Sequence, residues 1–333
     1  MMFAASNYGT WLPPMFSEHG VHVDRLLDIL HVFMGLLFVG WGLFFVYCLF
    51  RFRARVGHRA SHELVKGKIS KYLEVGVALF EAFLLVGLSM PVWAEYKNDP
   101  PKLDARQEIR VVAQQFQWNF HYPGKDGEFG RTDASLISDS NPIGLAEAED
   151  DPAAADDVVT NELHLPVGKP VYLRLTSMDV IHSFSIPALR VKQDVIPGME
   201  IPIWFEVQEG ATSDKLCEQM RIQVPIKKAN WYKLRHQMAA VDHKDPKTGE
   251  VLLAKGQRLG FSWEAGDTLF ETLAKEGVTE LVLEPEYAMQ VVCAQLCGNS
   301  HFKMTANIIT HTSSDFTAWM ASESAGAEEG FEF

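Results

Sequence analysis

Four side chains that can bind a soft metal ion lie within twelve residues near the end of the chain. They are Cys293, Cys297, His301 and Met304, in the run V-V-C-A-Q-L-C-G-N-S-H-F-K-M. Thiolate and thioether sulfurs select Cu(I) or iron–sulfur chemistry, and imidazole binds copper or zinc, so a set that includes methionine favours copper over zinc. The stretch is therefore predicted to be a metal site.

A helix or a disulfide could also account for the spacing in this stretch. Residues four, four and three apart can mark the buried face of one helix. Val291 and Val292 instead predict a strand that enters the stretch, and Gly298-Asn299 predicts a turn within it, so we expect a loop. A disulfide between Cys293 and Cys297 would leave the histidine and the methionine unexplained. We therefore expect both thiols to point at one metal centre.

The stretch resembles the copper loop of subunit II of the haem–copper cytochrome c oxidases. In that family the loop reads Cys, two variable residues flanking Glu, Cys, Gly, two more, His, two more and Met. The resemblance implies a dinuclear copper centre, CuA, in which the thiolates of Cys293 and Cys297 bridge two copper ions. His301 and Met304 would be terminal ligands. A cupredoxin with a single copper ion would need only one cysteine.

Gln295 stands where the family usually has glutamate. The family uses the main-chain carbonyl of this residue as a copper ligand, and glutamine supplies that carbonyl equally well. The family's glutamate carboxylate also binds a magnesium ion at the boundary with subunit I. Gln295 has no carboxylate, so magnesium binding is left open here.

A second stretch, Asp179–Phe184 (D-V-I-H-S-F), follows a predicted strand and matches another motif of the same family. A histidine after a strand is commonly just a polar residue near a turn, but here the match is long. It continues through Pro187, Arg190–Lys192, Asp194 and Pro197-Gly198. The resemblance makes His182 the fifth side-chain ligand, 111 residues before Cys293. The site would then be assembled from two loops of one sandwich.

The N-terminal part contains two apolar segments long enough to cross a bilayer. Ile29–Phe50 has no Asp, Glu, Lys or Arg over 22 residues, and Tyr72–Trp93 is a second span. The loop between them, residues 51–71, has seven Lys or Arg residues and one acid, which places it in the cytoplasm and both termini outside. No secretory signal pattern precedes the first span, so an uncleaved span is expected to export the C-terminal part.

Two carboxylates, Glu74 and Glu81, interrupt the second span. Carboxylates inside a membrane are costly and are therefore candidates for function, although Glu74 could simply lie at the headgroup level beside Lys71. Leu73-Glu74 looks like a Leu-Glu pair of the family whose glutamate stands at the mouth of a proton pathway. The resemblance implies that role for Glu74. Glu81 has no such match and would either face a partner subunit or be neutral.

An aromatic-rich segment follows the linker Asn98–Pro101. Gln107–Ala113 alternates as a strand, and Gln114–Tyr122 (Q-Q-F-Q-W-N-F-H-Y) predicts another. Such aromatic residues could simply line one face of a sandwich. The family has a Gln-Trp-aromatic-Trp motif here, whose first tryptophan receives electrons. Phe116 holds that first position and Trp118 the second, so both rings are candidates for accepting electrons.

Ten acidic residues and one basic residue lie between Asp126 and Asp157. The run predicts a loop that is mostly solvated, whose charge could dock a basic partner or serve only solubility. We expect acidic surface near Phe116 to attract a basic electron donor. The net charge of −13 agrees with a basic partner and argues against nucleic acid.

The rest of the chain predicts further strands and one large insertion. Leu163–Thr176 predicts a strand, a turn and a second strand. Val207–Glu286 interrupts the family resemblance with about 80 residues that include a predicted helix at Gly266–Glu276. A lid, a docking surface and a contact to another subunit are all open as its role. Ala306–His311 predicts a last strand and Ser314–Ser322 a short helix.

These elements predict a transmembrane helical hairpin over residues 1–98 and an all-β, cupredoxin-like Greek-key sandwich over 99–320. The last residues, 321–333, are expected to form a disordered acidic tail. Cys48 lies in an apolar span and Cys217 is isolated, so no disulfide framework is expected.

The resemblance implies subunit II of a respiratory cytochrome c oxidase in a bacterial inner membrane. It would accept electrons from cytochrome c, or from another periplasmic or membrane-bound cytochrome, and pass them to the haem centres of subunit I. There O2 is reduced to water with proton translocation. Subunit I, further oxidase subunits and the lipid bilayer are the implied partners.

Three other functions are consistent with parts of the sequence. A nitrous oxide reductase-like CuA protein shares the copper loop, but the membrane hairpin and the lack of a second, His-rich domain argue against it. A membrane-tethered copper-delivery protein would need fewer ligands. A quinol oxidase subunit lacks both cysteines.

Overall fold

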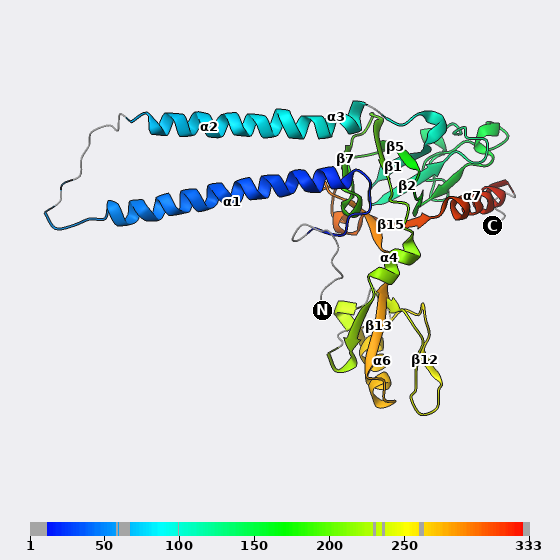
Figure 1. The fold of residues 1–333 in the computed structure, drawn as a ribbon. Helices are drawn as coiled ribbons and strands as arrows, with labels where there is room; N and C mark the ends of the chain where they lie inside the picture. The colour runs from blue at the N-terminus through cyan, green and yellow to red at the C-terminus, as the bar shows by residue number, and fades with distance from the viewer. Residues whose placement is uncertain are drawn as a thin grey trace. The chain divides into compact units, whose positions relative to one another are not determined.

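The structure is a computed structural model that describes residues 12–57, 59, 67–98, 100–228, 231–234, 237–259 and 263–328. Contacts divide the chain into two units. One contains His19–Pro100, and the other contains Phe16–Glu18 together with the chain from Pro101 onward. Figure 1 shows the helical unit in blue to cyan and the second unit in green to red.

The helical unit consists of two long helices. The first is α1 (Gly20–Arg51), and the second is built from α2 (Ile69–Phe83), a π-helical turn (Leu84–Ser89) and α3 (Met90–Asn98). Gly20–Arg51 and Ile69–Ala94 are both long and apolar enough to cross a membrane, and the two predicted spans fall inside them. Part of the basic loop between them lies outside the described residues.

The second unit is built around two five-stranded sheets. One has the order β3-β2-β1-β5-β8 and the other β4-β15-β14-β6-β7. The strands of the first sheet are β1 (Gln107–Gln114), β2 (Gln117–Tyr122), β3 (Val158–Thr160), β5 (Pro170–Ser177) and β8 (Ile201–Glu206). Those of the second are β4 (Leu163–Pro166), β6 (His182–Ile186), β7 (Val191–Val195), β14 (Met289–Cys293) and β15 (Thr305–His311).

The two sheets share one hydrophobic core. Alternate residues of β5 are buried, as expected for a strand with one face toward a core. Ile109, Leu173, Phe184 and Val291 are fully buried in this cluster, and each such side chain contributes about 1.5–3 kcal/mol by leaving water. The predicted sandwich is therefore present.

The pairing of β1 with β5 places two turns that are distant in the sequence at the same end of the first sheet. β1 and β5 run parallel, with Ala113 paired to Ser177, so the C-terminal ends of both strands lie side by side. β1 then turns at Gln115-Phe116 into the antiparallel β2. As a result, this turn lies beside the loop that follows β5.

One sequence prediction about strands is wrong and another is confirmed. Gln114–Tyr122 is not one strand, because Gln114 pairs with Gln117 across a two-residue turn and the segment forms the end of a hairpin. The two strands and the turn predicted for Leu163–Thr176 are present as β4 and β5. These strands belong to different sheets, so their turn crosses from one sheet to the other. Aromatic residues begin within the turn at Gln115-Phe116 and continue at every second position of β2, which hides that turn from a pattern analysis.

The acidic run is an ordered loop that its own carboxylates hold in place. Asp157 is buried, and its Oδ2 accepts a hydrogen bond from the Gly130 backbone N–H at 2.7 Å. The same oxygen lies 2.6 Å from His121 Nε2. Seven of the ten acids are exposed, in agreement with a mostly solvated loop. The loop leaves after β2 and rejoins at β3, whose Val158 pairs with Tyr122. Both of its ends therefore lie roughly 20 Å along β2 from the turn at Phe116.

The insertion begins with a segment that belongs to the sandwich. Val207, Ala211 and Leu216 are buried in the sandwich core, and α4 (Ser213–Gln219) lies in this segment. The insertion therefore becomes separate only after α4.

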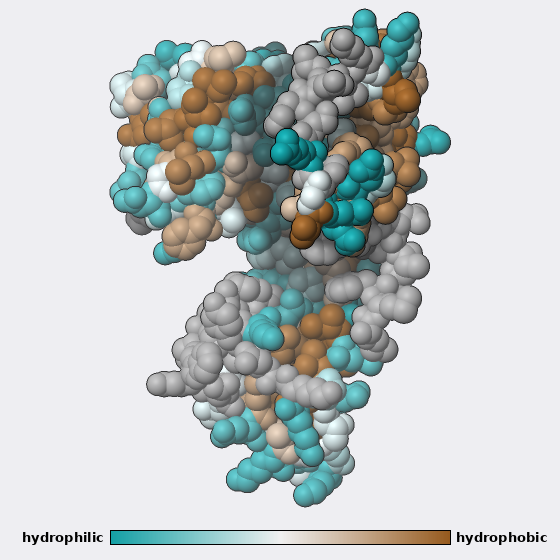
Figure 2. All heavy atoms as spheres, turned by 90° about the vertical axis from the view of Figure 1, so that its left-hand side faces the viewer, coloured by the Kyte–Doolittle hydropathy of each residue, from teal (hydrophilic) through white to brown (hydrophobic). Residues whose placement is uncertain are grey.

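The remainder of the insertion has its own core and secondary structure. Its elements are β9 (Ile222–Pro225), α5 (Trp231–Leu234), β10 (Gln237–Ala239), β11 (His243–Lys244), β12 (Val251–Leu253), α6 (Trp263–Lys275) and β13 (Glu280–Pro285). They form a sheet of order β10-β13-β9 and a two-stranded ribbon. A separate cluster that includes Leu253, Leu273 and Leu283 fills its interior. On the face seen in Figure 2, polar side chains surround a small apolar area of this lower part.

The C-terminal helix is longer than predicted. α7 (Ser313–Glu328) replaces the short helix and most of the expected disordered tail, and residues 329–333 lie outside the described residues. Trp319 on α7 stacks on His164 with ring centroids 3.9 Å apart. His164 Nδ1 in turn lies 2.9 Å from His311 Nε2, so these rings join α7 to β4 and β15.

Candidate metal centre

Two loops of the second sheet position the predicted ligands. β14 ends at Cys293, and the chain then forms a loop and a 3₁₀ turn (His301–Lys303) before β15. β6 begins at His182, and its Phe184 pairs with Cys293. A hydrogen bond from the Ala294 N–H to the Ser183 carbonyl (2.9 Å) holds the two loops side by side. The expected loop, rather than a helix, therefore carries the cysteines.

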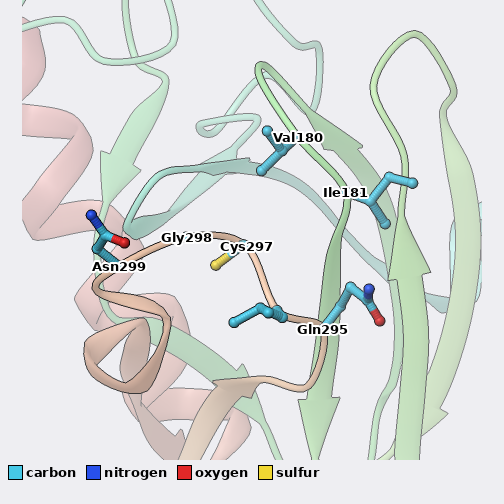
Figure 3. A pocket seen from close by; sticks show the side chains of 7 residues that line it. Val180, Ile181, Gln295, Cys297, Gly298 and Asn299 are labelled. Carbon is cyan, nitrogen blue, oxygen red and sulfur yellow. The ribbon is translucent and has the colours of Figure 1, made fainter.

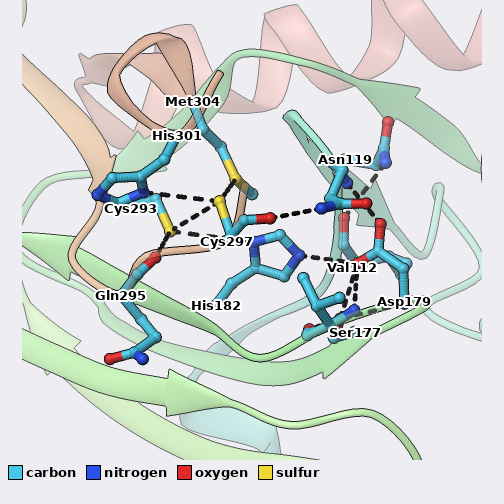
Figure 4. Close-up of polar contacts among 12 residues, drawn as sticks. Val112, Asn119, Ser177, Asp179, His182, Cys293, Gln295, Cys297, His301 and Met304 are labelled. Carbon is cyan, nitrogen blue, oxygen red and sulfur yellow. Dashed lines mark hydrogen bonds and ion pairs between the residues drawn. The ribbon is translucent and has the colours of Figure 1, made fainter. Parts of the chain in front are cut away.

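The sulfur atoms of Cys293 and Cys297 lie 3.9 Å apart (Figure 4). Cys293 Sγ is 3.9 Å from His182 Nδ1, and Cys297 Sγ is 3.6 Å from His301 Nδ1. Met304 Sδ lies 3.7 Å from Cys297 Sγ. All five predicted side chains thus converge on one place.

The main-chain carbonyl of Gln295 also faces this cluster. Its oxygen lies 3.1 Å from Cys293 Sγ, while the Gln295 side chain points away from the sulfurs (Figure 4). The backbone rather than the side chain is therefore available as a ligand. Copper binding by this carbonyl stays a prediction.

The chemistry of this set fits a soft metal. His182 and Met304 are fully buried, and Cys293 and Cys297 are nearly so. Among the described residues, the ligand atoms of His182, Cys293 and Cys297 lie within 4.8 Å of one another. Two thiols, two imidazoles and a thioether suit copper better than a hard, oxygen-preferring ion.

Asp179 holds the ring of His182. Its Oδ1 lies 2.8 Å from His182 Nε2, which leaves Nδ1 facing the sulfur of Cys293. Carboxylates that hold a metal-binding histidine in this way fix its tautomer and ring orientation. Burial acts to raise the pKa of Asp179, but hydrogen bonds from His182 and from the backbone N–H groups of Gln115 and Val180 lower it overall. Asp179 is the first residue of the Asp179–Phe184 motif, and the motif alone does not indicate this role.

The Cys297 thiol is a poor acid without a metal. Burial and the neighbouring Cys293 thiol raise the pKa of Cys297 to about 11. Because a metal binds thiolate, loading this site must release protons.

The two aromatic candidates for electron acceptance differ in exposure. Phe116 is half-buried at the β1–β2 turn, and its ring lies next to Gly298 of the copper loop. Trp118 is fully buried, with ring centroids 6.1 Å from His182 and 5.4 Å from Phe184. The structure thus places one ring at the surface and the other inside the core.

A surface hollow opens beside the copper loop. Residues 180–181 of one ligand loop and 295–299 of the other line it (Figure 3). Ile181 and Leu296 are exposed apolar side chains there. Glu74 and Glu81 are exposed residues of the separate helical unit, so their roles stay predictions.

Comparisons with known proteins indicate the family of the chain. Residues 108–226 match the family model described as cytochrome c oxidase subunit II, periplasmic domain. The match includes His182 and ends before the copper loop.

Relatives of known name support the same family. The chain is 37% identical over 212 residues to an alternative cytochrome c oxidase subunit 2 of Bradyrhizobium diazoefficiens, which covers 63% of this chain and 74% of the relative. It is 26% identical over 239 residues to cytochrome c oxidase subunit 2 of Cereibacter sphaeroides, and this match covers 66% of this chain and 75% of the relative. The periplasmic domain of subunit II of cytochrome oxidase (CoxB) of Bradyrhizobium japonicum matches with a TM-score of 0.33 and 19% identity, covering 68% of this chain and 99% of that domain. On the strength of the sequence matches, the chain belongs to the cytochrome c oxidase subunit II family.

Proposed function

We propose that this chain is the electron-accepting subunit of a haem–copper oxidase and that it holds a dinuclear copper centre. The ligands would be the side chains of His182, Cys293, Cys297, His301 and Met304 and the main-chain carbonyl of Gln295. Membership of the subunit II family makes an oxidase complex the setting. The arrangement of ligands around the two sulfurs supports the dinuclear form.

Each sulfur has its own set of additional ligands, and this observation carries the proposal. Cys293 Sγ is close to His182 Nδ1 and the Gln295 carbonyl, at 3.9 and 3.1 Å. Cys297 Sγ is close to His301 Nδ1 and Met304 Sδ, at 3.6 and 3.7 Å. Two ions would each receive one histidine and one weaker ligand, with both thiolates between them. Such a centre supplies one-electron transfer when it is bound.

The protein around the site favours rapid electron transfer. The ligands come from strand ends and short loops that are pinned by backbone hydrogen bonds, including Cys293 N–H to the Met304 carbonyl at 3.1 Å. Full burial of His182 and Met304 keeps water from these two ligands. A rigid, dry site needs little rearrangement when its charge changes.

Phe116 is the proposed point at which electrons arrive. Its ring is partly exposed and lies against Gly298, the residue after Cys297. Trp118 is buried beneath the site, so a donor would have to reach it through other side chains. The sandwich would face the periplasm, and a cytochrome would be the donor.

The acidic loop would act on the donor only at long range. It joins the sandwich roughly 20 Å along β2 from Phe116, so direct contact at both places would need a broad donor surface. Its seven exposed carboxylates would instead attract a basic donor through the overall field. Subunit I would receive the electrons, and Glu74 would serve as the mouth of a proton pathway.

Stopped-flow reduction of the copper-loaded full chain by ferrocytochrome c tests this function. Phe116→Ala is expected to slow reduction per bound copper centre, because it removes the ring that packs on the copper loop, while Phe116→Trp preserves or speeds it. Raising the salt should slow association with the wild type. An unchanged rate in Phe116→Ala, at equal copper content, would move electron arrival elsewhere, and no reduction of the wild type would contradict electron acceptance.

A further inference from the structure

The turn between β1 and β2 contacts both ligand loops through a single residue, Gln115. Its side-chain amide Nε2 donates to the Cys297 carbonyl at 2.5 Å. Its backbone N–H donates to Asp179 Oδ2 at 2.7 Å. The other oxygen of that carboxylate holds His182 Nε2 at 2.8 Å. Gln115 thus links Cys297 to Asp179, the carboxylate that orients the ring of His182.

Close packing between this turn and the copper loop supports a specific role. Gly298 has a φ of +137°, and a Cβ built there would lie 2.7 Å from Gln115 Nε2 and 3.0 Å from the Phe116 ring. Only glycine combines that backbone conformation with such a close approach. The amide of Gln115 therefore lies directly over the peptide that follows Cys297.

We propose that Gln115 is a positioning residue for the metal centre, which it both holds in shape and tunes. This inference rests on the proposed dinuclear copper function. The hydrogen bond to the Cys297 carbonyl fixes the peptide that carries one bridging thiolate. The positive end of the amide dipole, held beside that residue, stabilises the form of the centre that has gained an electron. Losing the donor should therefore loosen the loop and lower the reduction potential.

Gln115→Met tests the inference, with Gln117→Met as its matched control. Methionine has a similar length but no N–H donor, and the backbone bond from residue 115 to Asp179 is retained. Gln117 lies in the same hairpin, but its amide donates to Asn119 and Asn161, at 2.7 and 3.0 Å, rather than to the copper loop. Gln115 is exposed, so the substitution leaves the sandwich core unchanged.

Three quantities are measured on the copper-loaded full chain in detergent: copper release to a chelator, the reduction potential and the copper EPR spectrum. In Gln115→Met, release should be about five- to tenfold faster, the factor expected for one lost neutral hydrogen bond, and the potential should fall. The dinuclear EPR pattern should remain. Gln117→Met should match the wild type. Gln115→Asn, whose shorter amide reaches the carbonyl less well, should lie between the wild type and Gln115→Met.

Wild-type release and potential in Gln115→Met would overturn the positioning role, and so would equal changes in Gln117→Met. Both results are distinct from failure of the proposed function. If the wild type itself binds no copper pair, the dinuclear centre is wrong, whereas a wild-type pair that is indifferent to Gln115 rejects this inference alone.

Discussion

The sandwich and the later part of the insertion each have a hydrophobic core, but they use the same residue types differently. In the sandwich, two cysteines and two histidines converge from two loops. In the later part of the insertion, the buried His243 contacts the backbone of Val282. Cys217 lies on α4, in the segment that joins the insertion to the sandwich, near the Glu286 carbonyl. Burial, with nearby Glu284 and Asp214, raises the pKa of Cys217 to about 11. Convergence of loops, rather than residue type, therefore separates a metal site from ordinary packing.

Removing a thiol of the copper loop, compared with removing the thiol of α4, should give the largest contrast. Cys293→Ser is expected to abolish the dinuclear copper signal while leaving a folded domain, because one thiolate cannot bridge as two do. Cys217→Ser should leave the signal intact. Copper content and EPR of both variants provide the measurement. A dinuclear spectrum that survives Cys293→Ser would show that this sulfur does not bridge.

A leucine-to-alanine change in each core should show whether copper binding depends on the stability of the sandwich alone. Leu283 in the insertion and Leu173 in the sandwich are both fully buried. Either leucine-to-alanine change should cost about 2–5 kcal/mol in its own region. Leu283→Ala should lower the hydrogen-exchange protection of the insertion without altering the copper spectrum, whereas Leu173→Ala should speed copper loss. If Leu283→Ala perturbs the copper centre as strongly, the two cores are not independent.

A smaller effect is expected on the stability of the sandwich, which should fall at acidic pH because of His164. Burial, helped by neighbouring His311, lowers the pKa of His164 from 6.5 to about 3. Burial also lowers the pKa of His311, although Asp315 and Asp214 act to raise it. The unfolded chain gains a proton on His164 as the pH falls through 6.5, while the folded chain stays neutral there until about 3. Stability is therefore retained above 6.5 and lost progressively below it.

The expected result is a fall in the unfolding temperature of the sandwich between pH 7 and pH 4.5 that is smaller in His164→Gln than in the wild type. Differential scanning calorimetry at both pH values measures it. Equal falls in the two proteins would remove His164 from the account.

Much of the fold and site could be predicted because the signals were local. An unbroken apolar run shows where α1 lies, and the spacing of Cys293, Cys297, His301 and Met304 indicates a metal loop. Gln115 stands before Phe116 in the aromatic-rich segment, but the segment does not indicate its role, because its partners are 64 and 182 residues away in the chain. The β1–β2 turn was hidden because the aromatic pattern of β2 begins within the turn itself. α7 extends through Ala, Ser and Glu residues whose apolar pattern is weak, so its length depends on packing such as that of Trp319 on His164.

The central claim is that two copper ions share the thiolates of Cys293 and Cys297. Metal analysis together with EPR of the copper-loaded, partly oxidised full chain tests it most directly. The account predicts two copper ions per chain and a seven-line hyperfine pattern, because one unpaired electron is shared by two copper nuclei. One copper ion per chain with a four-line pattern would contradict it.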